Sequence, residues 1–383
     1  MTRPLREPAD RPVATASDPA IKDVVVHTYR LPYRGIVNFR SVTEDRGEYA
    51  LLRIIADNGQ EGLAEAVCRP EQHGEDAAAL ANTINTLFKP RLIGLDPLAH
   101  LAAHTAMNRV KFCRSAKSLI DVALWDLKGK ILGQPVWRLL GAAKPQPVPL
   151  TWLVHGNSRE AMVAEAVRQR DERGYNSMKV KTWKRNMEDV RTVEEIRNAL
   201  GDSAFLYVDG NGSYTEGEAR SILARVADYN VTFIEEPCKF TDPVRQARFA
   251  AQMPLPLLGD QCLQSLEEVQ LHMRLGAIGA VNIKLRRTGF TQSLKIAAVT
   301  EAAGLPVIIG TDSESRIGAM ARIHFRAALP WLAPYPAETH FFDKLVDDPF
   351  RGDFLFKDGA ITPSDAPGFG AGVDLQKLES LSI

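Results

Sequence analysis

The spacing of apolar and polar positions changes along this chain. Near the N-terminus, residues 23–31, 48–56 and 61–66 alternate like antiparallel strands, and Asp57-Asn58-Gly59 predicts a turn between the last two. Helical spacing follows from about residue 75 to 140 and is clearest over 115–133. Strands followed by helices predict an α+β domain over residues 21–145.

A proline-rich connector at 145–149 precedes a different pattern, in which short apolar strands alternate with helices. The predicted strands are 148–154, 177–180, 204–208, 232–234, 257–259, 280–284 and 306–309, with an eighth near 338–342. Helices such as 159–173 and 187–200 lie between them. This alternation predicts an α/β fold, a (β/α) barrel of modified TIM type over 146–345. The α+β domain would cap it, and segment 346–383 could return to that cap.

Composition narrows the class of protein. A length of 383 residues suits a barrel with a second domain. The 47 basic and 47 acidic residues cancel, so neither a nucleic acid nor a membrane surface is an expected partner. Residues 1–20 lack the apolar core of a signal peptide and are expected to form a flexible tail. Four cysteines without paired spacing indicate free thiols and a cytoplasmic protein.

Five charged residues follow the apolar strands of the predicted barrel at nearly even steps of 28, 26, 25 and 24 residues. They are Lys181, Asp209, Glu235, Asp260 and Lys284. Each step is about one strand–helix unit, so a closed parallel barrel would bring all five to one mouth. Three carboxylates in one small volume need a cation, and oxygen ligands favour Mg²⁺, with Mn²⁺ as a substitute. Solvated acids at loop starts are the simpler alternative for any single one of them.

The lysines suit proton transfer. Lys179 and Lys181 lie two residues apart on a strand and point to the same side, so their repulsion should lower the pKa of one of them toward a useful base. Lys284 follows a strand on the far side of the carboxylates. Two bases facing each other across a metal suit abstraction of a proton on one face and its return on the other. Asn211 and Glu236, beside the predicted ligands, could support them.

With this array the chain resembles the enolase superfamily, in its muconate-lactonizing subgroup, over residues 21–375. The resemblance rests on the ordered set Lys179-Val180-Lys181, Val208-Asp209-Gly210-Asn211, Ile234-Glu235-Glu236-Pro237, Gly259-Asp260-Gln261 and Asn282-Ile283-Lys284, together with helical motifs in 116–141. It implies an enolase-like fold, a magnesium site, a small carboxylate substrate and a homo-oligomer. It also implies an active site between the barrel mouth and loops of the cap.

Several positions bear on the substrate. Tyr33, Arg34 and Arg40 in the first cap loop could clamp an anion or form a solvated basic turn, and Trp152 could line the pocket or pack in the core. Glu314 matches a position whose acid, by the resemblance, lies near the substrate. The seventh strand is not followed by a His, which argues against His-dependent acid-sugar dehydratases.

The predicted function is that of a Mg²⁺-dependent isomerase or lyase that removes the proton α to a carboxylate. A cycloisomerase or an amino-acid racemase/epimerase is the first expectation. An acid-sugar or hydroxyproline-type dehydratase on the same fold, a Schiff-base aldolase using Lys284, and a non-catalytic scaffold barrel stay open. The sequence names neither the substrate nor the outcome of the reaction.

Overall fold

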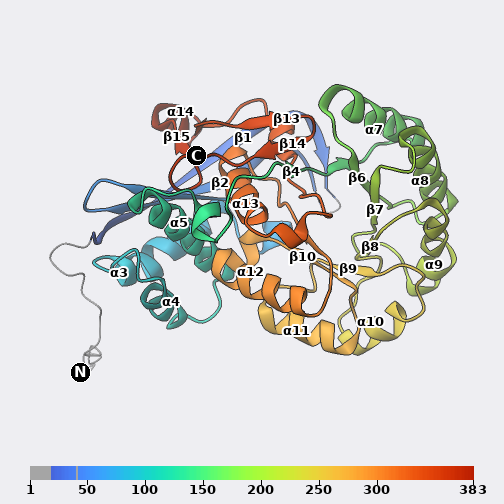
Figure 1. Cartoon of the computed structure of the whole chain (residues 1–383), viewed down its shortest axis with the longest axis horizontal. Coiled ribbons are helices and arrows are strands. Elements are labelled where there is room, and N and C mark those ends of the chain that lie inside the picture. Colours follow the sequence, from blue (N-terminus) through green and yellow to red (C-terminus); the bar gives the residue numbers. More distant parts are fainter. Residues whose placement is uncertain (1–18, 40–41) are drawn as a thin grey trace.

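Two bodies of secondary structure, a mixed α/β cap and a strand–helix barrel, lie side by side in the molecule (Figure 1). The coordinates are a computed structural model that describes residues 19–39 and 42–383. Residues 1–18 of the predicted tail and Arg40 of the predicted clamp lie outside the described residues. Of the described helices, none has the length and apolar character needed to cross a membrane.

The cap is built on an antiparallel sheet in the order β1-β2-β3, with β2 and β3 joined by the predicted Asp57-Asn58-Gly59 turn. Its strands are β1 (Ile21–Asn38), β2 (Thr43–Ala56) and β3 (Glu61–Cys68). Its helices are α1 (Pro70–His73), α2 (Ala77–Thr83), α3 (Lys89–Leu92), α4 (His100–Asn108), α5 (Arg114–Ile131) and α6 (Val136–Leu139). A π-helical turn, Ile84–Phe88, joins α2 to α3. Most apolar positions of α5 are buried, and the helix packs against β3.

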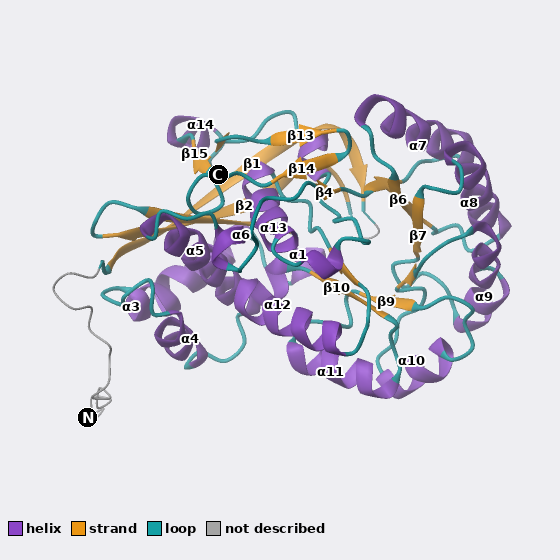
Figure 2. Cartoon of the chain, viewed as in Figure 1, coloured by secondary structure: helices purple, strands orange, loops and turns teal. Residues whose placement is uncertain are grey.

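The barrel carries seven parallel strands in the unbroken order β11 to β5, with helices around the outside (Figure 2). The strands are β5 (Trp152–Val154), β6 (Ser177–Lys181), β7 (Phe205–Asp209), β8 (Ile234–Glu235), β9 (Leu257–Gly259), β10 (Ala280–Ile283) and β11 (Val307–Ile309). The helices are α7 (Arg159–Arg173), α8 (Met187–Leu200), α9 (Glu216–Ser221), α10 (Pro243–Ala250), α11 (Leu266–Leu275), α12 (Leu285–Ala302) and α13 (Arg316–Ala327). A seven-residue 3₁₀ segment, Leu223–Tyr229, follows α9. This confirms the alternation of strands and helices predicted from sequence. The helices are the crossovers that neighbouring parallel strands need.

The eighth strand predicted near 338–342 is absent from the described structure. Ala337 forms a single parallel bridge with Leu150, and the Glu338 N–H donates to the carbonyl oxygen of Ile309 at 2.8 Å. This short stretch connects the two ends of the seven-stranded sheet, after which the chain turns into a 3₁₀ helix at Phe341–Lys344. Two residues are enough to close the barrel here, so no longer strand is needed.

The C-terminal segment packs on the cap and on the first barrel unit. Its elements are β12 (Phe350–Arg351), β13 (Leu355–Lys357), β14 (Ala360–Thr362), β15 (Gly372–Val373) and α14 (Leu375–Ser380). β14 pairs with β4 (Val148–Pro149), and the Arg30 N–H of β1 donates to the carbonyl oxygen of Leu381 at 3.0 Å. In Figure 1 the red end of the chain accordingly lies over the blue strands of the cap.

Gly62 allows β3 to approach α5 closely, and its replacement should destabilise the cap. A Cβ at position 62 would overlap the Ala123 carbonyl oxygen and lie 2.7 Å from the Leu127 nitrogen. We expect Gly62→Ala to cost about 2 kcal/mol of unfolding free energy, as overpacking does. Chemical denaturation measures this. Gly217→Ala is the matched control, because Gly217 lies in α9 with nothing within 4 Å, and alanine should stabilise that helix.

Candidate active site

The carboxyl ends of the barrel strands place the predicted charged residues in one row. Pairing between parallel strands sets Lys181 opposite Asp209, and Asp209 opposite Glu235. Asp260 directly follows β9, and Lys284 directly follows β10 as the residue before α12. Because β6 and β10 are separated by three strands of a curled sheet, Lys181 and Lys284 stand on different sides of the mouth.

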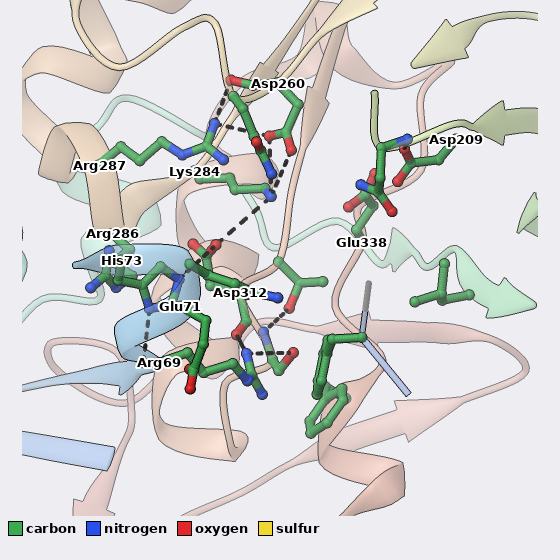
Figure 3. A pocket seen from close by; sticks show the side chains of 18 of the residues that line it. Arg69, Glu71, His73, Asp209, Asp260, Lys284, Arg286, Arg287, Asp312 and Glu338 are labelled. Carbon is green, nitrogen blue, oxygen red and sulfur yellow. Dashed lines mark hydrogen bonds and ion pairs between the residues drawn. The ribbon is translucent and has the colours of Figure 1, made fainter. Parts of the chain in front are cut away.

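The two outer lysines are each held by one of the acids. The Lys181 Nζ lies 2.6 Å from Asp209 Oδ2, and the Lys284 Nζ lies 3.1 Å from Asp260 Oδ2. Figure 3 shows Lys284 reaching toward Asp260 on one side and Asp312 on the other. The Lys284 Nζ–Asp312 Oδ1 distance is 3.7 Å. The five-residue array is therefore brought together at one mouth.

Lys179 lies deeper than either of these lysines. Its buried ammonium group is 2.7 Å from Glu235 Oε2, 3.2 Å from Asp209 Oδ2 and 3.0 Å from Glu338 Oε1. Burial disfavours its charge, but Glu235, Glu338 and Asp209 outweigh burial and hold the pKa of Lys179 well above its ordinary value. Repulsion between the paired lysines was expected to lower the pKa of one of them. It does not lower the pKa of Lys179, because three carboxylates surround this lysine.

Asp260 and Asp312 form the charge-paired side of the site. Asp260 is buried and the Asp312 side chain is only 9% exposed, which favours their neutral forms, yet their pKa values lie well below the ordinary range. The causes are Arg287 and Lys284 for Asp260, and the same two cations for Asp312. The Arg287 Nη1 is 2.9 Å from Asp260 Oδ1. Both acids are therefore ionised at neutral pH.

A cavity of about 1000 Å³ opens above this row. The cap contributes residues from the end of β1, from α1 and from the loop before α5, while the barrel contributes the strand ends. Nine lysines and arginines line it against six aspartates and glutamates. An excess of cationic side chains around a concave site attracts anions, so the cavity suits a negatively charged small molecule.

Comparison with known proteins identifies the family. The family described as "Enolase C-terminal domain-like" matches residues 161–377, and "Mandelate racemase / muconate lactonizing enzyme, N-terminal domain" matches residues 21–141. The chain belongs to the enolase superfamily, in its muconate-lactonizing subgroup. The two matches correspond to the cap and to most of the barrel with part of the C-terminal segment.

Similar proteins in the superfamily are isomerases. A chloromuconate cycloisomerase of Pseudomonas putida is 30% identical over 367 residues, which is 94% of this chain and 98% of the relative. An N-succinyl-L-Arg/Lys racemase of Bacillus cereus is 29% identical over 79% of this chain and 84% of the relative. A muconate lactonizing enzyme structure from Pseudomonas fluorescens, solved with muconolactone, has a TM-score of 0.90 and 26% identity, covering 96% of this chain and 100% of that chain. The chain is thus an enzyme of the muconate cycloisomerase-like type.

Asn211 and Glu236 lie beside the acids, as their positions next to the predicted ligands in the sequence suggested. Both have left-handed backbones, with φ of 44° and 37°. The Asn211 Oδ1 accepts hydrogen bonds from the Lys181 Nζ at 2.6 Å and from the Trp183 Nε1 at 3.2 Å. The Glu236 Oε1 accepts the Asp260 N–H at 2.9 Å. These contacts orient one lysine and one acid of the array.

The structure places the remaining candidates away from the cavity wall. Glu314 is buried and pairs with Arg322, and it also accepts from the Thr311 hydroxyl at 2.8 Å. The Tyr33 hydroxyl is buried between Arg69 and Glu44. Neither residue lines the cavity, nor do exposed Arg34 and buried Trp152. Of the predicted first cap loop, the residues at the cavity are Val37, Asn38 and Phe39.

The donor set fits a hard divalent cation. Asp209, Glu235 and Asp260 supply three buried carboxylates, the ligand type that such a cation prefers. Glu235 Oε2 and Asp260 Oδ1 are ion-paired with Lys179 at 2.7 Å and with Arg287 at 2.9 Å, but neither oxygen accepts an aligned hydrogen bond within the described residues. As the side chains lie, no three acidic, His or Cys groups of the described chain enclose one point. Lys179 bridges Asp209 and Glu235 instead, so a cation would compete with this ammonium group for the same oxygens.

Sequence reasoning missed several charged residues of the cavity. Asp312 follows β11 within a few residues, and Glu338 follows the short bridge that closes the barrel. Asp312 comes after an apolar strand, which is the signal that identified the other acids, whereas Glu338 follows a proline-rich turn over 330–337 that carries no such signal. Arg69, His155 and Lys344 also line the cavity, but no pattern of spacing distinguishes them from ordinary surface residues.

Proposed function

We propose that this enzyme removes the proton α to a carboxylate of a small anionic substrate, with Mg²⁺ bound by Asp209, Glu235 and Asp260. The observation that carries the proposal is the pair Lys181 and Lys284 on different sides of a mouth floored by those acids. The outcome would be cycloisomerisation or racemisation/epimerisation, the reaction types of the similar chloromuconate cycloisomerase and N-succinyl-L-Arg/Lys racemase.

The chain's own groups would divide the work. The Nζ of one lysine takes the proton from the α-carbon, and the Nζ of the other stands ready on the second face to return one. When bound, Mg²⁺ would place positive charge where the enolate charge develops, and would favour a neutral amine on a neighbouring lysine. Asn211 holds the Lys181 Nζ at 2.6 Å, which fixes its direction. Manganese could serve in place of magnesium.

The cavity supports an anionic substrate. Its cationic excess would attract a carboxylate, and Arg286 and Arg287 add two guanidinium groups beside Lys284. Arg287 is engaged by Asp260, whereas Arg286 contacts the Val67 carbonyl oxygen at 3.1 Å. Among the candidate clamp residues, Tyr33 would act through Arg69, which lines the cavity and donates to the Tyr33 hydroxyl at 3.0 Å.

Proton exchange in D₂O tests the proposal whichever product the reaction forms. We expect a panel of muconolactones, N-acylated amino acids and hydroxyprolines to include a compound whose α-proton exchanges for deuterium in the presence of Mg²⁺. Nuclear magnetic resonance measures the exchange. Chelation should stop it, and added Mg²⁺ should restore it. Exchange that survives exhaustive chelation would contradict the metal role, and loss of water from the substrate would indicate a dehydratase.

A further inference from the structure

Trp183 lines the cavity without belonging to the apolar core. It comes two residues after the end of β6, and its side chain is half-buried. Among the described residues, its ring is not one of the apolar side chains that pack on the buried core. Its Nε1–H donates to Asn211 Oδ1 at 3.2 Å, and the Lys181 Nζ lies 5.4 Å from the centroid of the ring. Core packing therefore does not account for this tryptophan, whose contacts lead to one lysine of the array.

The loop that carries Trp183 is held in place from outside the cavity. The buried Asp189 carboxylate on α8 accepts the Lys184 and Arg185 N–H groups at 3.3 and 2.8 Å. The Arg185 guanidinium in turn donates to both carboxylate oxygens of Glu218 on α9, at 2.7 and 2.8 Å. These contacts fix the backbone next to Trp183, so the indole is preorganised beside the mouth.

The side-chain oxygen of Asn211 is shared by two donors. It accepts from the Lys181 Nζ at 2.6 Å as well as from the indole of Trp183. An indole nitrogen donates but does not accept, whereas a side-chain amide has an accepting oxygen and a donating nitrogen. Trp183 therefore requires Asn211 to turn its oxygen, and not its nitrogen, toward the side on which Lys181 lies.

This orientation of the amide matters when Lys181 acts as a base. An amine that removes a proton uses its nitrogen lone pair and has two N–H groups besides. If the oxygen of Asn211 faces the amine, Lys181 donates one N–H to it and the lone pair stays free. If the amide were turned over, its NH₂ group would donate to that lone pair and occupy it. The base would then be blocked by its own neighbour.

We propose that Trp183 is a positioning residue, whose indole N–H fixes the amide of Asn211 so that the lone pair of Lys181 faces the substrate. The inference rests on the proposed function, in which Lys181 serves one face of the α-carbon. In that step the C–H bond breaks, the proton moves to the Lys181 Nζ, and the electron pair of the bond stays on the substrate as the enolate. Lys284 has its own contacts, with Asp260 and Asp312. Trp183 should therefore affect one face only.

Trp183→Phe tests this role, because it keeps an aromatic ring and removes the N–H. Exchange in D₂O is measured for both enantiomers of a substrate with Mg²⁺-loaded enzyme, and Lys181→Met identifies the enantiomer that Lys181 serves. For that enantiomer we expect kcat to fall about five- to tenfold, the factor that one hydrogen bond contributes, with KM unchanged. Exchange of the other enantiomer should stay at the wild-type rate. In an Asn211→Leu background, Trp183→Phe should have no further effect, since no amide is left to orient.

Trp125→Phe is the matched control. Trp125 is also half-buried, and its indole N–H donates to the Thr291 Oγ1 at 3.1 Å, outside the cavity. Its loss should leave the ratio of the two exchange rates unchanged. The proposal is overturned if Trp183→Phe slows both enantiomers alike, slows neither, or raises KM alone, which is what a wall of the cavity would do.

A second measurement needs no turnover and separates this role from the proposed function. In ¹⁵N-tryptophan-labelled protein, Trp183→Phe assigns the indole N–H resonance of Trp183, or Trp183→Leu does so if the first variant does not fold. Asn211→Leu should shift that resonance upfield and speed its hydrogen exchange with water about tenfold, whereas Lys284→Met should change neither. An unchanged resonance in Asn211→Leu would overturn the proposal. A shifted resonance in a protein that exchanges no α-proton would support the orienting contact and contradict the proposed function alone.

Discussion

Lys284→Met is expected to slow α-proton exchange by about a thousandfold or more while the protein stays folded. A positioned general acid or base contributes roughly 10²–10⁴-fold, and methionine cannot carry a proton. The fold should tolerate the change, because Asp260 keeps Arg287 at 2.9 Å and Asp312 keeps Arg322 at 3.8 Å. Exchange in D₂O with Mg²⁺ measures the rate, and circular dichroism measures the melting temperature.

Lys181→Met provides a matched partner, because the two lysines would act on different faces of the same carbon. With a substrate available as two enantiomers, each variant should lose exchange of a different enantiomer, which a generally damaged site would not produce. Lys239→Met serves as the control for loss of one positive charge at the cavity. If Lys284→Met retains exchange within tenfold of the wild-type rate, Lys284 is not one of the two bases.

The array could be predicted from sequence because a parallel barrel turns spacing into position. Each acid or lysine follows a short apolar strand, so counting one strand–helix unit per step is enough to place Asp209, Glu235 and Asp260 together. The same logic applies to Asp312, which follows the strand predicted at 306–309. It does not reach Glu338, because the eighth strand was predicted near 338–342, whereas the structure closes the barrel with a bridge at Ala337.

Contacts between loops could not be predicted in this way. His155 and Lys344 are 189 residues apart and meet only because the barrel closes on itself. The high pKa of Lys179 likewise depends on Glu338, which comes from the other end of the barrel. For Arg34 the sequence left an anion clamp and a solvated basic turn open; its side chain is exposed and does not line the cavity.

Glu235→Gln is expected to abolish Mg²⁺ binding and exchange without lowering the stability of the metal-free protein. Burial is the largest influence on Glu235 and raises its pKa well above the ordinary value, so folding disfavours its ionised form. An acid whose pKa is higher in the folded than in the unfolded state contributes less to stability as the pH rises, because folding then buries its charge. A neutral amide avoids this cost of burying a charge at pH 7. Lys179 keeps Asp209 and Glu338 as partners. The metal-free melting temperature should therefore equal or exceed that of the wild type.

Mg²⁺ binding is measured by the change that the ion causes in the melting temperature. Ligand that binds only the folded state stabilises it by about 2.7 kcal/mol at a hundred times its Kd. Loss of one of three carboxylates should weaken Mg²⁺ by about a hundredfold or more, since even changes beyond the direct ligands cost 10–100-fold. Wild-type protein should thus gain melting temperature with Mg²⁺, and Glu235→Gln should gain almost none at the same concentration.

Glu314→Gln is the matched control, since it changes another buried glutamate that lies outside the cavity. Among the described residues, its loss leaves buried Arg322 with one ion pair, the 3.8 Å contact to Asp312, so we expect a cost of about 3 kcal/mol in unfolding free energy. The rise in melting temperature that Mg²⁺ causes in Glu314→Gln should match the rise in the wild type. The two variants therefore have opposite signatures, one losing metal binding and the other losing stability. A full Mg²⁺ shift in Glu235→Gln would show that the ion binds elsewhere and that the three strand-end acids do not form its site.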